Sequence, residues 1–538
     1  MTNQIFTDNR VRKSVFPARI FGASGNVENV SVLEEPVELQ IGLSETHLAK
    51  VNGKGFVVLD FGREFNGAIR LLAQVIEGGG CQVRIRTGES VSECYAEQGE
   101  KNAGNHHTLR DITVTLPMYS DMEFLQTGFR FARIDFLEDK IVYIKSILAT
   151  EVRRDLHPTG GFTCNDERVN RIFDVASETL QQCMQTYIWD GIKRDRLVWI
   201  GDMHPETTAI ACLFGADESV ERSLDYIREH TPLPAWMNNT PTYTAWWIVI
   251  LHDYYEQNAC EDYLKKQIPY LKGALKLING VVREDGTIAA DGSFLFDWPS
   301  HESPDEIVGV YALWVLAAKK CRKLLETVGE SSAECDEMLA KLAKNHSFNV
   351  KKQKQCEAFL VYAGIKPAEE SYDFLTKDGA SGFSTFLSYY ILSAIADSGR
   401  HERAVELMKD YYGAMLDMGA TTFWEDFDIE RVKGSAPLYR LPEKGEKDIH
   451  GDFGKHCYVG FRHSFCHGWS CGPVQFLIKK IGGIEILEAG CKKMRIKPVT
   501  AGFTDYKITY PTPYGTVEIV LKNGKFDIKI PPEVTLVD

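Results

Sequence analysis

The sequence lacks several features that would assign it to a particular class of protein. Its 538 residues contain no run of 18 or more apolar residues, so we expect no membrane-spanning helix. Residues 1–19 hold no apolar stretch followed by a small-residue cleavage site, so we expect no secretory signal. No glycine pattern typical of a nucleotide-binding loop occurs. Acidic residues outnumber basic ones, with 75 Asp and Glu against 61 Lys and Arg. This balance argues against nucleic-acid binding, because phosphate contacts need clustered cations.

The 13 cysteines are too scattered to frame a small disulfide-rich fold, and no Cys-x-x-Cys pair occurs. Histidines and cysteines do gather between residues 450 and 471, where His463 and His467 are four residues apart. The ligand types are irregular, so we favour ordinary thiols and one functional histidine over a structural zinc site. We therefore expect a cytoplasmic protein of two to four domains without a metal site.

Residues 1–155 carry the period-two pattern of β-strands. Val83 and Ile85 alternate with arginines, and residues 112–116 alternate in the same way before a proline. Glycines between these runs mark turns. Many short strands separated by turns predict a β-sandwich.

Residues 156–485 change to the helical period. One apolar stripe falls at positions i, i+3, i+4, i+7 and i+11: Val169, Ile172, Phe173, Ala176 and Leu180. Ser303 and Pro304 predict a helix start, with serine as the N-cap and proline at the first helical position. About a dozen such segments occur without a fixed repeat, which disfavours a short-period solenoid. A barrel of paired helices accounts for this number, although periodicity alone does not establish it.

Residues 486–538 return to the β pattern. Asn523 and Gly524 separate two β-like runs and supply the two positive φ angles that a type I′ turn needs. The sequence therefore predicts a β-hairpin here, and the order β, then α, then β for the whole chain.

Acidic and aromatic side chains gather between two of the helical stretches. Three aspartates spaced by five and seven residues are interleaved with basic residues and lie near two tryptophans: Asp190, Asp195 and Asp202, with Trp189 and Trp199. A helix cap followed by a solvated charged loop is the ordinary interpretation of such a segment. Carboxylates beside tryptophans are also typical of carbohydrate sites, because carboxylates bind hydroxyls and ring faces cover the apolar face of a sugar.

Two further loops place an acid beside a tryptophan. Glu425 follows Trp424 after a helical stretch, and an aspartate precedes Trp298. The loops of a helical barrel meet at its ends, so we expect these clusters to converge on one pocket. Trp246 and Trp247 begin an apolar helix, and we interpret them as core residues.

The segment from Asp190 to Asp202 resembles the signature of the bacterial α-L-rhamnosidases, glycoside hydrolase family 78, whose usual form is Arg-Asp-Glu-Arg-x-x-Trp-x-Gly-Asp. Residues 419–425 resemble the second acidic motif of this family, and residues 464–469 resemble its histidine motif. Shorter likenesses in matching order extend the resemblance over most of the chain: residues 59–62, 128–131 and 511–515. The resemblance implies an (α/α)6 six-hairpin barrel at residues 156–485, between an N-terminal β-sandwich and a small C-terminal one.

The resemblance also implies roles for single residues. Asp195 takes the position of the general acid, which is normally a glutamate, and Glu425 that of the general base. Asp190 and Asp202 match acids that contact the rhamnose hydroxyls. The predicted substrate-binding residues are Asp190, Arg194, Trp199, Asp202, Trp298, Trp424 and His467. Because aspartate is one methylene shorter than glutamate, Asp195 must lie closer to the sugar, and Glu206 is a nearby acid that could compensate.

The implied activity is that of an inverting exo-α-L-rhamnosidase, which removes terminal α-L-rhamnose from small glycosides or oligosaccharides without a metal or organic cofactor. One carboxylic acid protonates the leaving oxygen while the opposite carboxylate activates water, at a separation of roughly 6.5–9.5 Å. Two alternatives stay open. Asp195 in place of glutamate suggests another exo-glycosidase of the same fold with a different sugar specificity, or a catalytically weak sugar-binding homologue.

Overall fold

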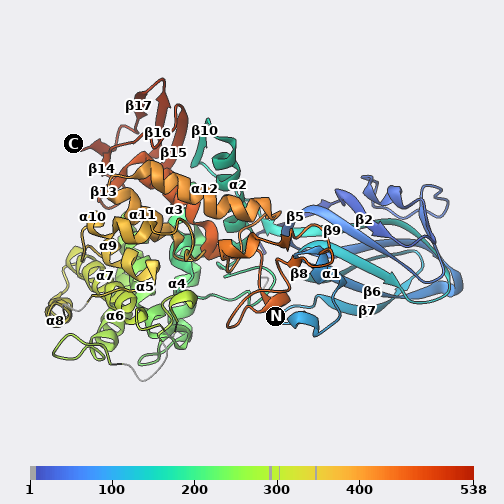
Figure 1. The fold of residues 1–538 in the computed structure, drawn as a ribbon, viewed down its shortest axis with the longest axis horizontal. Coiled ribbons are helices and arrows are strands. Elements are labelled where there is room, and N and C mark those ends of the chain that lie inside the picture. The colour runs from blue at the N-terminus through green and yellow to red at the C-terminus, as the bar shows by residue number, and fades with distance from the viewer. Residues whose placement is uncertain (1–7, 290–293, 302, 346–347) are drawn as a thin grey trace, which may run out of the picture.

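A computed structural model describes residues 8–289, 294–301, 303–345 and 348–538 of the chain. The molecule is elongated, with a β region at one end and a helical region with a smaller β region at the other (Figure 1). The order β, α, β in the chain agrees with the pattern in the sequence. Among these residues, no helix is long and apolar enough to cross a bilayer.

The N-terminal region contains an antiparallel sheet of nine strands in the order β3-β4-β9-β5-β8-β6-β7, with β1 paired to β9 and β2 to β5. The strands are β1 (Arg10–Val15), β2 (Arg19–Ala23), β3 (Val27–Glu28), β4 (Ala49–Asn52), β5 (Gly55–Ile76), β6 (Gly80–Gly88), β7 (Asp111–Pro117), β8 (Ser120–Phe136) and β9 (Ile141–Arg154). Val83 and Ile85 of β6 are fully buried, as their alternation predicted. The short helix α1 (Val91–Tyr95) follows β6, at the end of the sheet that faces the helical region (Figure 1).

The helical region is built on a ring of six helices. These are α3 (Met203–Phe214), α5 (Pro241–Asn258), α7 (Glu306–Thr327), α9 (Lys354–Tyr362), α11 (Ser388–Asp397) and α13 (Gly472–Gln475). Each contacts the next in turn, and α13 contacts α3, so the ring closes. The other long helices pack outside it: α2 (Glu167–Cys183), α4 (Glu218–His230), α6 (Glu261–Asn279), α8 (Ala333–Leu342), α10 (Ala368–Thr376) and α12 (His401–Asp417).

Burial separates these two sets of helices. Trp246 and Trp247 of α5 are both fully buried, which confirms their interpretation as core residues. An outer helix such as α2 buries one face only, and the predicted stripe from Val169 to Leu180 is that face. The Asp166 side chain caps α2 by accepting hydrogen bonds from two backbone N–H groups of its first turn. Helices of the ring therefore form the core, and the loops that precede them are left to build a site.

One predicted helix start is displaced. The helix expected to begin at Ser303 begins instead at Glu306 as α7. The carboxylate of Asp305, the residue just before it, accepts hydrogen bonds from the backbone N–H groups of residues 351–353. This tertiary contact fixes the helix entry, and the local serine-proline signal does not.

The C-terminal region contains two small sheets. One has the order β10-β15-β16-β17 and the other β13-β14-β18. The strands are β10 (Gly161–Cys164), β13 (Ile484–Glu488), β14 (Lys493–Ile496), β15 (Tyr506–Thr512), β16 (Gly515–Lys522), β17 (Lys525–Lys529) and β18 (Thr535–Leu536). Asn523 and Gly524 both have positive φ between β16 and β17, which confirms the predicted hairpin. Strand β10 lies in the range expected for the helical domain but pairs with β15.

Candidate active site

A pocket of about 450 Å³ lies at the end of the helical ring where the inner helices begin. Its walls come from the loops that precede α3, α5, α7 and α13 and from the segment that follows α12. Four acids and two tryptophans singled out in the sequence line it: Asp190, Asp195, Asp202, Glu425, Trp199 and Trp298. The structure thus brings together residues from three separate segments of the chain, of which the first and the last are more than 200 residues apart.

Asp190 and Asp202 form the buried side of the pocket. A carboxylate oxygen of Asp190 accepts a hydrogen bond from the backbone N–H of Leu197 at 2.9 Å. Asp202 accepts one from the Tyr243 hydroxyl at 2.8 Å and lies 3.2 Å from Nε2 of His467. Burial raises the pKa of Asp190 well above its usual value and also raises the pKa of Asp202. Both carboxyl groups are held in fixed orientations, as hydrogen-bonding groups for a polar ligand must be.

Glu425 is held as an ionised carboxylate. Only 3% of the residue is exposed, one carboxylate oxygen pairs with the Arg194 guanidinium, and the other accepts the backbone N–H of Ser464 at 3.2 Å. Burial alone would raise the pKa of Glu425, but the charges of Arg194 and His467 outweigh it and lower the pKa below its usual value. A carboxylate of this kind can accept a proton from water.

Asp195 lies nearer the mouth of the same pocket. Its side chain is 15% exposed and is 3.2 Å from the Arg194 guanidinium and 3.2 Å from the His107 imidazole. Asp195 and Arg196 both have a φ of 57°, a left-handed conformation that costs an ordinary residue about 1–2 kcal/mol. The surrounding contacts must hold this loop in place. One guanidinium, that of Arg194, spans the gap between Asp195 and Glu425.

His467 is a buried cation at the base of the pocket. Burial lowers the pKa of His467, but the hydrogen bond to Asp202 and the charges of Glu425 and Asp190 outweigh it and raise the pKa to about 9. His463 differs, because its Nε2 accepts the backbone N–H of Asp426 at 2.9 Å. The two histidines therefore serve separate partners and do not share one helical face. All 13 cysteines lie within the described residues and are free thiols.

Two expectations are corrected by the structure. Trp424 does not line the pocket; it is 1% exposed and stacks on Phe465 with ring centroids 4.1 Å apart, so it is a core residue. Glu206 is fully buried behind Gly468, where an added Cβ would lie 1.6 Å from its carboxylate. Because it does not reach the pocket, Glu206 cannot compensate for a shorter acid at Asp195.

Several lining residues were not predicted as site residues: Asn238, Asn239, Thr240, Tyr243, Leu295, His301, Cys457, Arg462 and Trp469. Nothing in the spacing of Tyr243 shows that its hydroxyl donates to Asp202. Asn238 and Asn239 have positive φ, which asparagine tolerates better than most residues. The Asn-Asn pair just ahead of a helix-starting proline is a signal that could have located this loop.

The comparisons with known proteins agree with this geometry. Residues 157–344 match the bacterial α-L-rhamnosidase six-hairpin glycosidase domain. The match assigns residues 157–344 to the six-hairpin glycosidase domain of the bacterial α-L-rhamnosidases. The matched range includes the whole loop from Asp190 to Asp202. No curated protein sequence matches the chain.

Solved rhamnosidase structures share the fold over most of the chain. The family 78 rhamnosidase of Bacillus sp. GL1 has a TM-score of 0.74 and 20% identity, over 94% of this chain and 55% of the Bacillus one. The Klebsiella oxytoca rhamnosidase, solved with rhamnose bound, has a TM-score of 0.68 and 19% identity, over 87% of this chain and 96% of its own. The Aspergillus terreus α-L-rhamnosidase gives 0.71 and 18%, over 97% and 61%. The chain thus spans little more than half of the Bacillus enzyme but nearly all of the Klebsiella one.

Proposed function

We propose that the protein is an inverting exo-α-L-rhamnosidase that releases terminal α-L-rhamnose from small glycosides or oligosaccharides. The observation that carries this proposal is the convergence of four acids in one pocket of a rhamnosidase-family domain: Asp190, Asp195, Asp202 and Glu425. The Klebsiella oxytoca rhamnosidase was solved with rhamnose bound and the Streptomyces avermitilis α-L-rhamnosidase with L-rhamnose, which supports the choice of sugar.

In this proposal Asp195 is the general acid and Glu425 the general base. Glu425 has its pKa lowered, so it is ionised at neutral pH and can take a proton from the attacking water. Asp195 is the more exposed of the two carboxyl groups, so it would face a leaving group that departs toward the solvent. Two carboxyl groups are sufficient for this chemistry, and inversion requires room for one water between the base and the sugar.

The remaining pocket residues would bind the sugar. Asp190 and Asp202, fixed by their own hydrogen bonds, would accept hydrogen bonds from sugar hydroxyls. Trp199 and Trp298 line the pocket and would cover the apolar face of the sugar ring. Because the buried acids stand at the inner side of the pocket, a sugar enters with its terminal residue first, which suits an exo mode of action.

We also propose a domain architecture for the chain. The closed ring of α3, α5, α7, α9, α11 and α13 with its outer helices supports an (α/α)6 barrel. We assign residues 1–155 to an N-terminal β-sandwich, residues 156–485 to the barrel and residues 486–538 to a small C-terminal β-sandwich.

The direct test is incubation with an aryl α-L-rhamnoside, with NMR of the first sugar released to identify its anomer. Release of the β-anomer supports the proposal, and release of the α-anomer contradicts inversion. No release, with the Glu425→Gln variant equally inactive, contradicts the activity. A panel of other aryl glycosides tests a different exo-glycosidase, which Asp195 in the glutamate position favours as the second candidate.

A further inference from the structure

The loop that carries Asp195 rests on the N-terminal sheet. The backbone N–H of Gly128, in β8, donates to the carbonyl of Ile192 at 3.0 Å. The hydroxyl of Thr108 donates to the carbonyl of Lys193 at 2.9 Å. The guanidinium of Arg196 donates to a carbonyl of β8, that of Gln126, at 2.8 Å. These three hydrogen bonds bind this loop to the N-terminal region of the chain.

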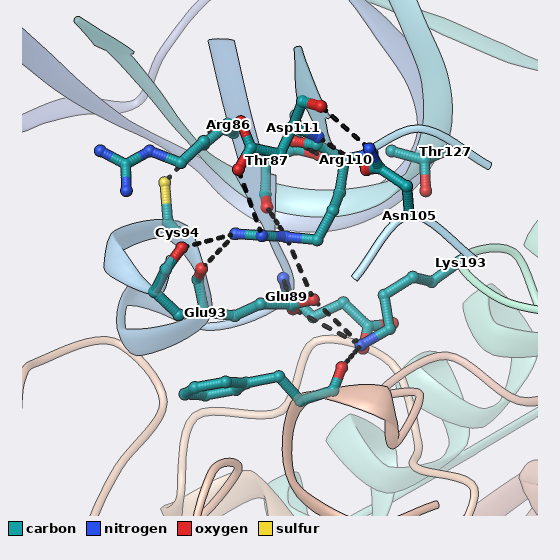
Figure 2. A network of polar contacts seen from close by, with 12 residues as sticks. Arg86, Thr87, Glu89, Glu93, Cys94, Asn105, Arg110, Asp111, Thr127 and Lys193 are labelled. Carbon is teal, nitrogen blue, oxygen red and sulfur yellow. Dashed lines mark hydrogen bonds and ion pairs between the residues drawn. The ribbon is translucent and has the colours of Figure 1, made fainter. Parts of the chain in front are cut away.

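Lys193 makes the strongest of these contacts. Its residue is 7% exposed, and its ammonium lies 2.7 Å from Glu89 and 3.3 Å from Glu93, which belong to the β6–α1 segment (Figure 2). It also donates to the carbonyls of Phe461 and His463 at 2.8 and 2.6 Å. Burial lowers the pKa of Lys193, but the two glutamates outweigh it and raise the pKa, so the lysine is a cation.

Glu89 connects this lysine to the other side of the pocket. It is 1% exposed, and one of its oxygens accepts a hydrogen bond from the Ser464 hydroxyl at 3.3 Å. The backbone N–H of the same serine donates to Glu425. Nearby, the Glu64 carboxyl of β5 accepts from the Thr422 hydroxyl at 3.2 Å, in the segment that leads to Glu425. Glutamates of the N-terminal sheet therefore contact both pocket loops.

Cation binding does not explain this cluster. Glu89, Glu93 and His450 have oxygen and nitrogen atoms close enough together to ligate a metal ion. The Lys193 ammonium, however, already lies among them and supplies the positive charge that the two carboxylates need. Desolvation of the charges offsets much of the attraction in a salt bridge buried this deeply, so net stability alone does not account for it.

We propose that Glu89 and Lys193 are positioning residues, whose buried salt bridge fixes the Arg194–Asp195 loop and the Ser464–Glu425 contact relative to each other. The proposal deepens the rhamnosidase activity proposed above and rests on it. In physical terms, the pair holds two carboxyl groups from different loops of the helical region at the separation that the reaction needs. A displacement of about 1 Å at such a site can lower the rate about 100-fold.

The test compares Glu89→Gln, Lys193→Met and the double variant. Glu89→Gln leaves Lys193 with Glu93 as its remaining carboxylate partner, whereas Lys193→Met leaves two buried carboxylates without their cation. We therefore expect the larger fall in Tm for Lys193→Met, and the double variant, which removes one of these carboxylates with the lysine, recovers part of that Tm. If the pair positions the loops, the double variant keeps a kcat at least about 30-fold below wild type with KM changed less than about threefold. Amide hydrogen exchange of peptides covering residues 190–202 is expected to be faster in it.

The matched control is the pair Arg154 and Asp217, joined at 2.7 Å between β9 and the start of α4, and neither residue lines the pocket. The double variant Arg154→Met with Asp217→Asn is expected to change Tm but neither kcat nor exchange at residues 190–202. Full kcat in the Glu89→Gln, Lys193→Met double variant, or unchanged exchange in those peptides, overturns the positioning role. An inactive wild type contradicts the proposed function instead, and the exchange comparison still decides the positioning role.

Discussion

The two carboxyl sides of the pocket are held by different parts of the molecule. Glu425 is 3% exposed, and its backbone carbonyl accepts hydrogen bonds from the hydroxyl of Thr385 and the indole of Trp469, both in the helical region. Asp195 is partly exposed, sits on a left-handed backbone and contacts His107 of the N-terminal region. The candidate base is thus fixed mainly by its own domain, while the candidate acid depends on its neighbour. The geometry of the pair is a property of the interface between the two regions.

Removal of the Glu425 carboxylate should have the largest effect. We expect Glu425→Gln to lower kcat on an aryl α-L-rhamnoside by about 1,000-fold or more, because loss of a general base costs about 100- to 10,000-fold. The fold of the variant is checked by Tm. Asp426→Asn is the matched control, since this neighbouring acid pairs with Arg431 and does not line the pocket. A Glu425→Gln variant within tenfold of wild type would remove Glu425 from the mechanism.

Substitution of Asp195, the candidate general acid, should have an effect that depends on the leaving group. Asp195→Asn should lower kcat by about 100-fold or more on a rhamnosyl disaccharide, whose leaving alcohol needs a proton. The loss should be much smaller on a nitrophenyl rhamnoside, because nitrophenolate leaves without protonation. Asp195→Glu, which restores a proton donor, is the control. Equal losses on both substrates would show that Asp195 is not the acid.

The buried pair of His467 and Asp202 gives a pH-dependent prediction. The folded protein raises the pKa of His467 to about 9, above the unfolded value of about 6.5, so the folded state binds the proton more tightly. The stabilisation is complete below pH 6.5 and is lost as the pH rises through 9, by about 3 kcal/mol at most. We expect wild type to lose this much more unfolding free energy than His467→Gln between these pH values, measured by denaturant unfolding. If the free energy of unfolding depends on pH in the same way for both proteins, folding does not raise the pKa of His467.

Features that depend on residues close together in the sequence could be predicted from the sequence alone. The stripe of α2, the Asn523-Gly524 hairpin and the acids at 190, 195, 202 and 425 all rest on spacing or on a motif. The orientation of Trp424 could not be predicted, because a tryptophan next to an acid can face the pocket or the core with the same sequence. Its contact with Phe465, 41 residues later, decides between the two.

Contacts between the N-terminal region and the helical region could not be predicted from the sequence. The bonds of Lys193 to Glu89 and of His107 to Asp195 join residues about 90 to 100 positions apart. Lys193 and Arg194 are adjacent basic residues in the sequence, yet one is bound by the N-terminal sheet and the other by Glu425. A single sequence carries no signal of that division, since both are cations in one charged loop.

The smallest effect is expected for the contact between His107 and Asp195, and it tests which contact ties the candidate acid to the N-terminal region. His107 is the residue of the N-terminal region that contacts Asp195, and its side chain is 43% exposed, so the contact is weak and screened by solvent. We expect His107→Asn to lower kcat by only about threefold, with His106→Asn as the control, which should change it less. Measurement of kcat for both variants across pH 5–8 checks this. If His107→Asn instead matched the loss in the Glu89→Gln, Lys193→Met double variant, the imidazole contact, and not the buried salt bridge, would be what ties the acid to the N-terminal region.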